Sequence, residues 1–355
     1  MNILYFGPIA EKGKPAIGGY EAANRKNIDG LRNRGIEVIE YRNPTINKKW
    51  GVLGKLAYLK LFLYVLVPLK YVGRKDVIAH TTYLHNSFFM LPNAMLSRMM
   101  KLCGMKNVLD VRAGSTVELY EQGNSIYKYL MRITVECATA VTVEGMKYIT
   151  AIPKMTNIRK PIYYFPNLYD CQQIVVGEHK PPMDVINMFY FGSIKESKGI
   201  PLLLDLVEIL DDRFHLNLAG GIVNEALKER IDKTSRAHYL GKLTKDDLKK
   251  EMQKMHFFVF PTKHEGEGQS NSLIEAMGEG LIPITSCKGF CSDVVADCGS
   301  VLPLDATAED YKKEIHHWVD DMDMAEAAKK CQQHIIEHHN VNTEIDKLIE
   351  LYKSL

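Results

Sequence analysis

The sequence lacks the features that mark secreted and membrane-spanning proteins. Residues 1–7 (MNILYFG) contain no basic segment followed by an apolar run and a cleavage site, so they predict a core strand and not a signal peptide. The seven cysteines are irregularly spaced, which is typical of thiols in a reducing compartment and not of a disulfide framework. The apolar run at residues 61–69 is far shorter than the roughly 20 residues that a spanning helix needs. We therefore expect a cytoplasmic protein.

The sequence also lacks a recognisable metal or dinucleotide site. No Asp-x-Asp element ends a predicted strand, because Asp211 and Asp212 precede one and residues 320–323 lie in helical sequence. His334 and His338 are one helical turn apart, but no carboxylate cluster accompanies them. No Gly-x-Gly-x-x-Gly motif follows the first strand, which argues against a nicotinamide-dependent dehydrogenase. We expect neither a metal ion nor a bound cofactor.

What the chain does have is the composition of an ordinary globular protein. Its 355 residues exceed what one hydrophobic core usually supports, so two domains are expected. Apolar residues make up 46% of the chain and charged residues 25%, which are common values. The formal net charge of +2 gives no whole-chain reason to expect nucleic acid, so an electrostatic partner would have to meet a local patch.

Short apolar runs alternate with longer amphipathic stretches along the whole chain. Residues 20–34 and 86–102, for example, have the pattern of helices. Strands are predicted at 2–6, 36–41, 76–80, 107–111 and 140–143, and again at 186–191, 214–218, 238–240, 257–260 and 281–285. The alternation predicts parallel sheets covered on both faces, and hence an α/β fold of two tandem doubly wound, Rossmann-like domains.

A change of composition separates the two halves. Five prolines fall between residues 153 and 182, which is typical of a hinge. We expect an N-terminal domain at 1–165, a C-terminal domain at 166–340, and a final helix at 341–355 that packs back toward the first domain. Because such sheets bind ligands at the carboxyl ends of their strands, the expected site is a cleft between the two domains.

The segment at residues 261–284 has the pattern of an anion site. A strand at 257–260 ends at Pro261, a loop containing glycines follows, and a helix is predicted from Asn271 to Glu279 with Gly280 ending it. The amides and the positive dipole end of that helix would face one spot, where Asn271 and Ser272 lie. Glu275, one turn further on, could accept hydrogen bonds from a ribose, or could instead complete a capping box with Ser272.

The same segment resembles a known motif. Residues 267–275 (EGQSNSLIE), followed by Ala276, Met277, Gly280 and Pro283, resemble the paired-glutamate motif of the family-4 retaining glycosyltransferases. The resemblance implies the GT-B architecture. In that family the first glutamate approaches the donor sugar, the second holds the nucleotide ribose, and the backbone between them meets the diphosphate. Here these roles would fall to Glu267, to Glu275, and to the donor-binding segment Gln269, Ser270, Asn271 and Ser272.

The loop after the strand at 186–191 carries a second part of the resemblance. The family places an arginine and a lysine there, both on the donor diphosphate. Lys198 matches the lysine, which otherwise could be a solvated surface residue, and Gly192 begins the loop. Ser193 stands where the arginine is expected, so Lys195 or a residue of the other domain has to replace the lost charge, or the donor is held less strongly.

Two glycines of the first domain are donor-site candidates. Gly18 and Gly19 precede the first long helix, and paired glycines let a backbone approach a phosphate or a sugar closely. Such a pair can also serve only to turn the chain. The resemblance favours binding, because the family has its own glycine loop after the first strand.

Three further side chains of the first domain are expected to face the cleft. Arg112 could bind phosphate with two nitrogens and contribute to catalysis with Glu267 and Lys198, or it could form an internal salt bridge with Asp110. His80 and Glu144, at the end of their strands, are candidates for the acceptor side.

Residues 47–75 combine an apolar stretch with basic and aromatic residues. This composition is typical of an interfacial helix on an anionic membrane, although a helix covering the sheet with lysines at its rim has the same pattern. If the segment binds the membrane, the acceptor is expected to be linked to a lipid.

Taken together, the residues and the resemblance predict a retaining, metal-independent glycosyltransferase. The expected donor is a nucleotide sugar, with UDP favoured over GDP on family frequency, and the expected acceptor is a lipid-linked saccharide in bacterial surface polysaccharide synthesis. The enzyme would act at the inner face of the cytoplasmic membrane. The alternatives are a nucleotide-sugar epimerase of the same architecture and a non-catalytic nucleotide-sugar-binding protein.

Overall fold

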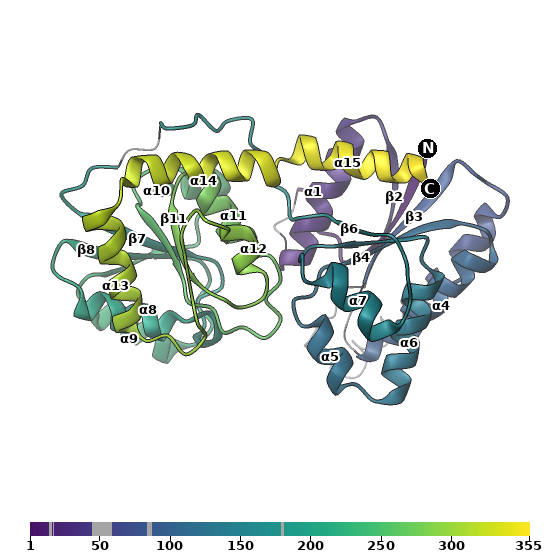
Figure 1. Ribbon diagram of the computed structural model, residues 1–355, viewed down its shortest axis with the longest axis horizontal. Helices are drawn as coiled ribbons and strands as arrows, with labels where there is room; N and C mark the ends of the chain where they lie inside the picture. The colour runs from purple at the N-terminus through teal and green to yellow at the C-terminus, as the bar shows by residue number, and fades with distance from the viewer. Residues whose placement is uncertain (14–15, 17, 45–58, 84–86, 179–180) are drawn as a thin grey trace. The chain divides into compact units, whose positions relative to one another are not determined.

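The chain forms two units, each built around its own parallel sheet (Figure 1). The computed structural model describes the whole chain except residues 14–15, 17, 45–58, 84–86 and 179–180. Unit 1 contains Met1–Leu168 and Val341–Leu355, and unit 2 contains Tyr169–Asn340. The chain therefore leaves unit 1 after one sheet is complete and returns to it with its last helix.

Unit 1 has a six-stranded sheet in the order β2-β1-β3-β4-β5-β6, with all strands parallel. The strands are β1 (Asn2–Gly7), β2 (Glu37–Arg42), β3 (Val77–Thr82), β4 (Lys106–Val111), β5 (Ala140–Val143) and β6 (Ile162–Tyr164). The helices are α1 (Gly19–Asn33), α3 (Leu59–Tyr64), η2 (Val67–Tyr71), α4 (Ser87–Leu102), α5 (Thr116–Gln122), α6 (Ser125–Cys137), α7 (Tyr148–Thr156) and α15 (Val341–Ser354). The direction of the chain along the sheet reverses between β1 and β3.

The alternation of side chains along β1 explains why helices cover both faces of this sheet. Ile3 and Tyr5 join a core with α1 and α15, whereas Leu4 and Phe6 join a second core with α3 and α4. The helix α15 lies close against α1, because a Cβ atom at Gly30 would be only 2.7 Å from Cγ1 of Ile345. A glycine at position 30 therefore permits the C-terminal helix to complete unit 1.

Unit 2 repeats the architecture with the strand order β12-β11-β10-β7-β8-β9, again parallel. The strands are β7 (Ile186–Phe191), β8 (Phe214–Ala219), β9 (Ala237–Gly241), β10 (Phe257–Phe260), β11 (Ile282–Ser286) and β12 (Ser300–Leu302). The helices are η3 (Glu196–Lys198), α8 (Ile200–Ile209), α9 (Glu225–Lys233), α10 (Lys245–Met252), α11 (Asn271–Gly278), α12 (Cys291–Val295), α13 (Ala308–His316), η4 (His317–Asp321) and α14 (Met324–His338). Here the chain reverses its direction along the sheet between β7 and β10.

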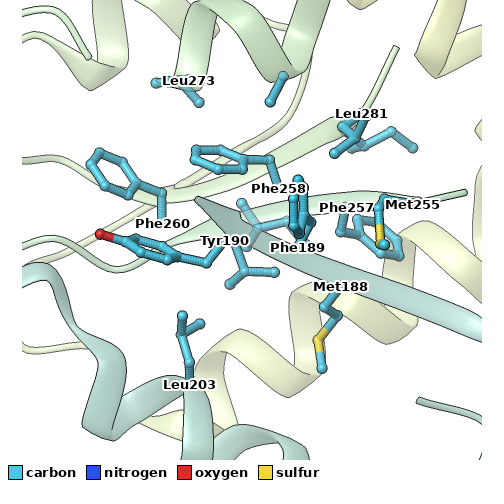
Figure 2. Close-up of a cluster of buried hydrophobic side chains, with 14 of the residues drawn as sticks. Met188, Phe189, Tyr190, Leu203, Met255, Phe257, Phe258, Phe260, Leu273 and Leu281 are labelled. Atoms are coloured by element: carbon cyan, nitrogen blue, oxygen red, sulfur yellow. The ribbon is translucent and has the colours of Figure 1, made fainter. Parts of the chain in front are cut away.

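The core of unit 2 is rich in aromatic side chains from its two central strands. Phe189, Tyr190, Phe257 and Phe258 are at most 1% exposed. Figure 2 shows these side chains between Leu203 of α8 on one side of the sheet and a leucine of α11 on the other. Since β7 and β10 are buried on both faces, their sequences are apolar and aromatic except for Asn187 of β7. This packing fixes the ends of the two strands at which the candidate site lies.

The predicted alternation of strands and helices is confirmed. The strands expected at 140–143, 186–191 and 257–260 have these same bounds, and most others differ by one residue at one end or at both ends. Two short edge strands, β6 and β12, are not among the predicted elements. The stretch at 153–182, whose composition is typical of a hinge, also contains regular structure, because Pro153 lies inside α7 and β6 falls within it. None of the helices in the described ranges has the length and apolar character required to cross a membrane.

Candidate active site

The candidate site lies where the chain reverses its direction along the sheet of unit 2. The strands β7 and β10 are neighbours, and the chain continues from them to opposite edges of the sheet. The carboxyl ends of two such strands are the usual ligand position in an open parallel sheet. The two loops contain the predicted donor residues Lys198 and Glu267, respectively.

The loop after β10 leads into the N-terminus of α11. Ser270 is the N-cap residue, and its Oγ accepts a hydrogen bond of 3.4 Å from the backbone N–H of Leu273. Ser270 Oγ also lies 2.9 Å from Ser272 Oγ. Backbone N–H groups in the first turn of a helix point out of its N-terminal end, and here this turn contains Asn271 and Ser272. The predicted start of this helix is therefore present, and the binding of an anion there stays a prediction.

The capping-box interpretation of Glu275 is wrong. Such a box needs an N-cap residue and a Glu or Gln three positions later, and in α11 these positions hold Ser270 and Leu273. Glu275 lies two positions further along, in the second turn, and is half-buried. Glu275 therefore lies on the same helix whose N-terminus would hold the diphosphate. The ribose is the part of the nucleotide next to the diphosphate, so a contact between Glu275 and the ribose stays a prediction.

Glu267 forms an ion pair with Lys198 across the two loops. Lys198 Nζ lies 2.5 Å from Glu267 Oε2, and the two side chains are only 16% and 8% exposed. The fully buried Thr262 donates a hydrogen bond of 2.9 Å from Oγ1 to the same carboxylate oxygen. The ammonium of Lys198 also lies 5.2 Å from the ring centroid of Phe260. One carboxylate oxygen is thus held by a cation and a hydroxyl, in a site mostly excluded from water.

Close backbone packing holds the two loops against each other. Gly199 has a φ of +79°, and a Cβ atom there would lie 2.2 Å from the carbonyl oxygen of Pro261. The N–H of Lys263 donates a hydrogen bond of 2.9 Å to the carbonyl of Ser197. On the other side, a Cβ atom at Gly289 would lie 2.2 Å from the carbonyl oxygen of Glu267. A side chain at Gly199 would separate the two loops, and one at Gly289 would displace the backbone of Glu267.

The loop after β7 shows how the missing arginine could be replaced. Gly192 and Ser193 are exposed, and the Ser193 carbonyl accepts a hydrogen bond of 2.8 Å from the hydroxyl of Tyr190. Lys195 is half-buried, and its pKa is lowered by burial and by the nearby charge of Lys198, partly offset by Glu267. Burial, Lys198 and Lys195 similarly lower the pKa of His264. Lys195 therefore lies within the electrostatic range of the site, as a second cation.

The glycine pair of unit 1 lies at the beginning of α1. Gly18 is the N-cap residue and Gly19 is the first residue of the helix. A Cβ atom at Gly18 would meet no atom within 4 Å, so the backbone there is open to the surroundings. This helix follows β1, one of the two strands between which the sheet of unit 1 reverses. The position is suitable for a ligand contact, which stays a prediction.

Arg112 and His80 belong to a buried network inside unit 1. Arg112 Nε lies 2.5 Å from Asp110 Oδ2, and its Nη1 donates a hydrogen bond of 2.6 Å to Asn167 Oδ1. His80 Nε2 lies 3.3 Å from the same Asp110 oxygen, and His80 Nδ1 lies 2.7 Å from the hydroxyl of Tyr352 on α15. His80 is 0% exposed and Arg112 is 2% exposed. The structure therefore shows the internal salt bridge that the sequence left open for Arg112.

The charges of this network stabilise one another. Burial alone would raise the pKa of Asp110, but the charge of Arg112 and the contact with His80 outweigh it and lower the pKa to about 2. Glu144, the other acceptor-side candidate, is 2% exposed and raises the pKa of Arg112 further through its charge. All three side chains are thus buried within unit 1, and the catalytic role of Arg112 and the acceptor-side roles of His80 and Glu144 stay predictions.

Two residues of these networks were missed by the sequence interpretation. Thr262 holds the carboxylate of Glu267, and its place two residues after β10 could have indicated that its hydroxyl faces the same loop. Tyr352 is hydrogen-bonded to His80 across 272 positions of the sequence, and no local pattern indicates this contact.

Gln269, predicted in the donor segment, is 5% exposed and lies directly before the N-cap of α11. Within the described ranges, no group of three or more His, Cys, Asp or Glu side chains is placed to hold a metal ion.

Comparisons with known proteins agree with this geometry. Residues 186–321, which include both loops of the site, match the family model described as glycosyl transferases group 1. The solved structure of HepE from Anabaena in complex with UDP has a TM-score of 0.73 at 16% sequence identity, and the match covers 100% of both chains. Sucrose-phosphate synthase from Thermosynechococcus elongatus has a TM-score of 0.76 at 16% identity, covering 100% of this chain and 99% of that one.

A glycosyltransferase from Rickettsia africae has a TM-score of 0.69 at 14% identity, covering 99% and 98% of the two chains. No curated protein matches the sequence. At these identities the solved structures establish the fold, which is GT-B, as predicted. The family-model match and the fold together support a glycosyltransferase enzyme.

Proposed function

We propose that this glycosyltransferase enzyme transfers a sugar from a nucleotide sugar held in unit 2, with retention of the anomeric configuration. The observation that carries the proposal is the ion pair of Lys198 and Glu267, in which Glu267 lies three residues before the N-cap of α11. A diphosphate is a strong ligand for a lysine and for helix amides, and a carboxylate beside them can accept hydrogen bonds from sugar hydroxyls. The site thus has partners for both parts of the donor.

The chemistry of the leaving group explains why these positive groups are needed. When the bond between the sugar and the diphosphate breaks, negative charge accumulates on the diphosphate oxygens. Preorganised N–H groups and cations lower the energy of that charge in a site with little water. We assign this role to the amides at the start of α11, to Lys198, and to Lys195 in place of the arginine that Ser193 replaces.

Glu267 has a different task in this scheme. Its carboxylate is buried, and one of its oxygens is already engaged by Lys198 and Thr262. It would orient the hydroxyls of the donor sugar and is not assigned as a covalent nucleophile. In the retaining reaction the acceptor hydroxyl attacks from the face that the leaving phosphate vacates. Glu275, on the second turn of α11, would hold the ribose.

We further propose that the donor is a UDP-sugar and that the acceptor is a lipid-linked saccharide. HepE is similar in fold and was solved with UDP and with UDP-glucose, which supports UDP as the first nucleotide to test. The enzyme would belong to family 4 and act in the synthesis of O-antigen, capsule or lipopolysaccharide at the inner face of the cytoplasmic membrane. Of the segment 47–75, on which the membrane proposal first rested, residues 47–58 lie outside the described ranges.

The test is to incubate the purified protein with a panel of UDP- and GDP-sugars and to measure free nucleotide and the anomeric form of the product. Release of UDP that rises when a polyprenyl-diphosphate saccharide is added supports the proposal. Isomerised nucleotide sugar without release would identify an epimerase. Tight nucleotide binding without any turnover, with or without acceptor, would identify a non-catalytic nucleotide-sugar-binding protein. The same assay on Lys198→Ala checks that the activity belongs to this site.

A further inference from the structure

The outer surfaces of α3, η2 and α4 expose a group of aliphatic side chains. Eight large ones are exposed there: Leu59, Leu63, Leu66, Leu69, Val72, Leu91, Met95 and Leu102. Leu63 and Leu102 have 66% and 74% of their surface in contact with solvent. Soluble proteins expose single apolar residues commonly, but a group of this size usually has a partner. Together with the basic residues described below, we call this surface the basic apolar face.

The exposed side chains form one surface, because the three elements cover the same face of the sheet. Leu61 and Tyr64 of α3 and Leu96 and Met100 of α4 lie in a single core cluster, which also contains Leu4 of β1. The helix α4 contacts both α3 and η2. The inner sides of these elements are therefore already buried, and the leucines on their outer sides are additional to what the core of unit 1 needs.

The spacing of the exposed residues follows the helical period. Leu59 and Leu63 are four positions apart on α3, as residues on one side of a helix are, and Leu66 follows in the turn before η2. On α4 the same relation holds for Leu91, Met95 and Leu102, with Arg98 at the remaining position of that side. Each element thus has an apolar inner side and an apolar outer side.

The charges carried by α3, η2 and α4 themselves are all positive. Lys60, Lys70, Lys75, Arg98 and Lys101 are exposed on it. The sequence contains no aspartate or glutamate at 59–75 or at 87–106, although the whole chain has a net charge of only +2. The nearest acid in sequence, Asp76, lies 2.5 Å from Arg74 and neutralises that residue alone. On the neighbouring α6, Glu136 lies near Arg98 and Lys101, since the charges of all three residues act on the thiol of Cys137. The exposed cations of the face thus outnumber the acids beside them.

We propose that the basic apolar face is the surface by which the protein docks on an anionic lipid bilayer, with α4 contacting the lipid alongside α3 and η2. Basic residues beside aliphatic side chains are what an anionic leaflet binds, because the cations meet headgroups while the leucines enter the acyl boundary. This extends the contact to an element outside the segment 47–75. The proposal rests on the proposed function in one respect, namely that the acceptor is carried by a lipid.

The composition of the face favours a lipid over a protein partner. The residues that dominate protein interfaces are tryptophan, tyrosine and arginine, whereas leucine and valine are under-represented among them. All eight large exposed side chains of the basic apolar face are aliphatic. Lipid binding does not need a complementary partner surface, so isolated leucines between cations are sufficient.

The experiment is flotation of the full chain with vesicles of phosphatidylcholine, with and without phosphatidylglycerol, at low and high salt. We expect binding only to the anionic vesicles, weakened by salt. Exchange of the exposed pair Arg98→Gln and Lys101→Gln should lower the binding constant by roughly thirtyfold, about fivefold for each charge. The pair Met95→Glu and Leu102→Glu should abolish flotation. The matched control is Val175→Glu in unit 2, where the side chain is 59% exposed.

The outcomes separate this proposal from the proposed function. Circular dichroism and UDP titration should be unchanged in both α4 variants, and Lys198→Ala should float normally while losing UDP affinity. A wild-type protein that binds UDP but does not float, or α4 variants that float as the wild type does, would overturn the docking surface alone. A dimer that the α4 variants disrupt, found without flotation, would assign the face to protein contact and also overturn it. Flotation without any nucleotide-sugar binding would overturn the proposed function instead.

Discussion

The ion pair between Lys198 and Glu267 leads to a prediction in which two neighbouring substitutions act in opposite directions. In the nucleotide-free protein the two charges neutralise each other at 2.5 Å, with side chains 16% and 8% exposed. At an effective dielectric constant of about 20, their raw attraction is about 7 kcal/mol, most of which is offset by desolvation of the two groups. A diphosphate that binds Lys198 has to share this cation with Glu267.

The substitution Lys198→Ala removes a charged hydrogen-bond donor to the diphosphate, which is worth about 1.5–3 kcal/mol. We therefore expect the Kd for UDP to rise roughly 10- to 100-fold. The substitution Glu267→Gln keeps the shape of the side chain but releases Lys198 from its competing carboxylate. The Kd for UDP should then stay the same or fall by up to about tenfold. Turnover of Glu267→Gln should nevertheless drop by about 100-fold or more, because the sugar loses its carboxylate partner.

The assay is calorimetric titration of UDP into both variants, together with initial rates of nucleotide release from the donor. The matched control is Lys233→Ala, a lysine of α9 whose side chain is 80% exposed. Thermal unfolding of each variant shows whether the second, unpaired charge disturbs the fold. The reasoning is refuted if Glu267→Gln weakens UDP binding as strongly as Lys198→Ala does, since the carboxylate would then hold the nucleotide and not compete with it.

The remaining predictions concern neighbouring groups. Thr262→Val should lower kcat by about tenfold with little change in the Kd for UDP, because the hydroxyl of Thr262 holds the carboxylate of the ion pair. Thr262→Ser keeps a hydroxyl and should have the kcat of the wild type, as rate assays on both variants can show. Lys195→Ala should weaken UDP binding by about tenfold and Lys195→Arg should not. Because the pKa of Lys195 is lowered, this ammonium loses its charge at a lower pH than an ordinary lysine does, so the UDP affinity of the wild type should begin to fall there in titrations across alkaline pH. Tyr352→Phe should lower the free energy of unfolding in urea by about 1 kcal/mol and leave UDP affinity unchanged, since it removes one buried hydrogen bond to His80. The pKa of Asp110 is lowered from 3.8 to about 2, so its carboxylate contributes roughly 2 kcal/mol to the free energy of unfolding above pH 4. This contribution should be lost as the pH falls toward 2 in the wild type, and urea unfolding of Asp110→Asn should show no such loss.

Much of the fold could be predicted because it depends on local patterns. The strands β7 and β10 are runs of apolar and aromatic residues except for Asn187 of β7, and such runs between amphipathic stretches have few alternatives to a buried parallel strand. The edge strands β6 and β12 have three residues each and follow no such run. Their formation depends on the neighbouring strand that accepts them, which the sequence of the segment itself does not encode.

The candidate site was predictable for a related reason. Its residues lie in two short segments that follow predicted strands, so their meeting at one end of the sheet follows from the topology of a parallel sheet. The burial of His80 could not be predicted in this way, because its hydrogen-bond partner Tyr352 is 272 positions away. The alternative in which Ser272 caps α11 could not be excluded from the sequence, since Ser270 and Ser272 are both good N-cap residues and only the backbone geometry distinguishes them.

The most direct test of the central claim is a crystal structure of the protein with UDP bound. We expect a diphosphate oxygen within hydrogen-bond distance of Lys198 Nζ and of the backbone amides of Asn271 and Ser272, with the ribose hydroxyls on the carboxylate of Glu275. A nucleotide bound elsewhere, with the ion pair of Lys198 and Glu267 unchanged and the N-terminus of α11 in contact only with solvent, would contradict the assignment of the donor site.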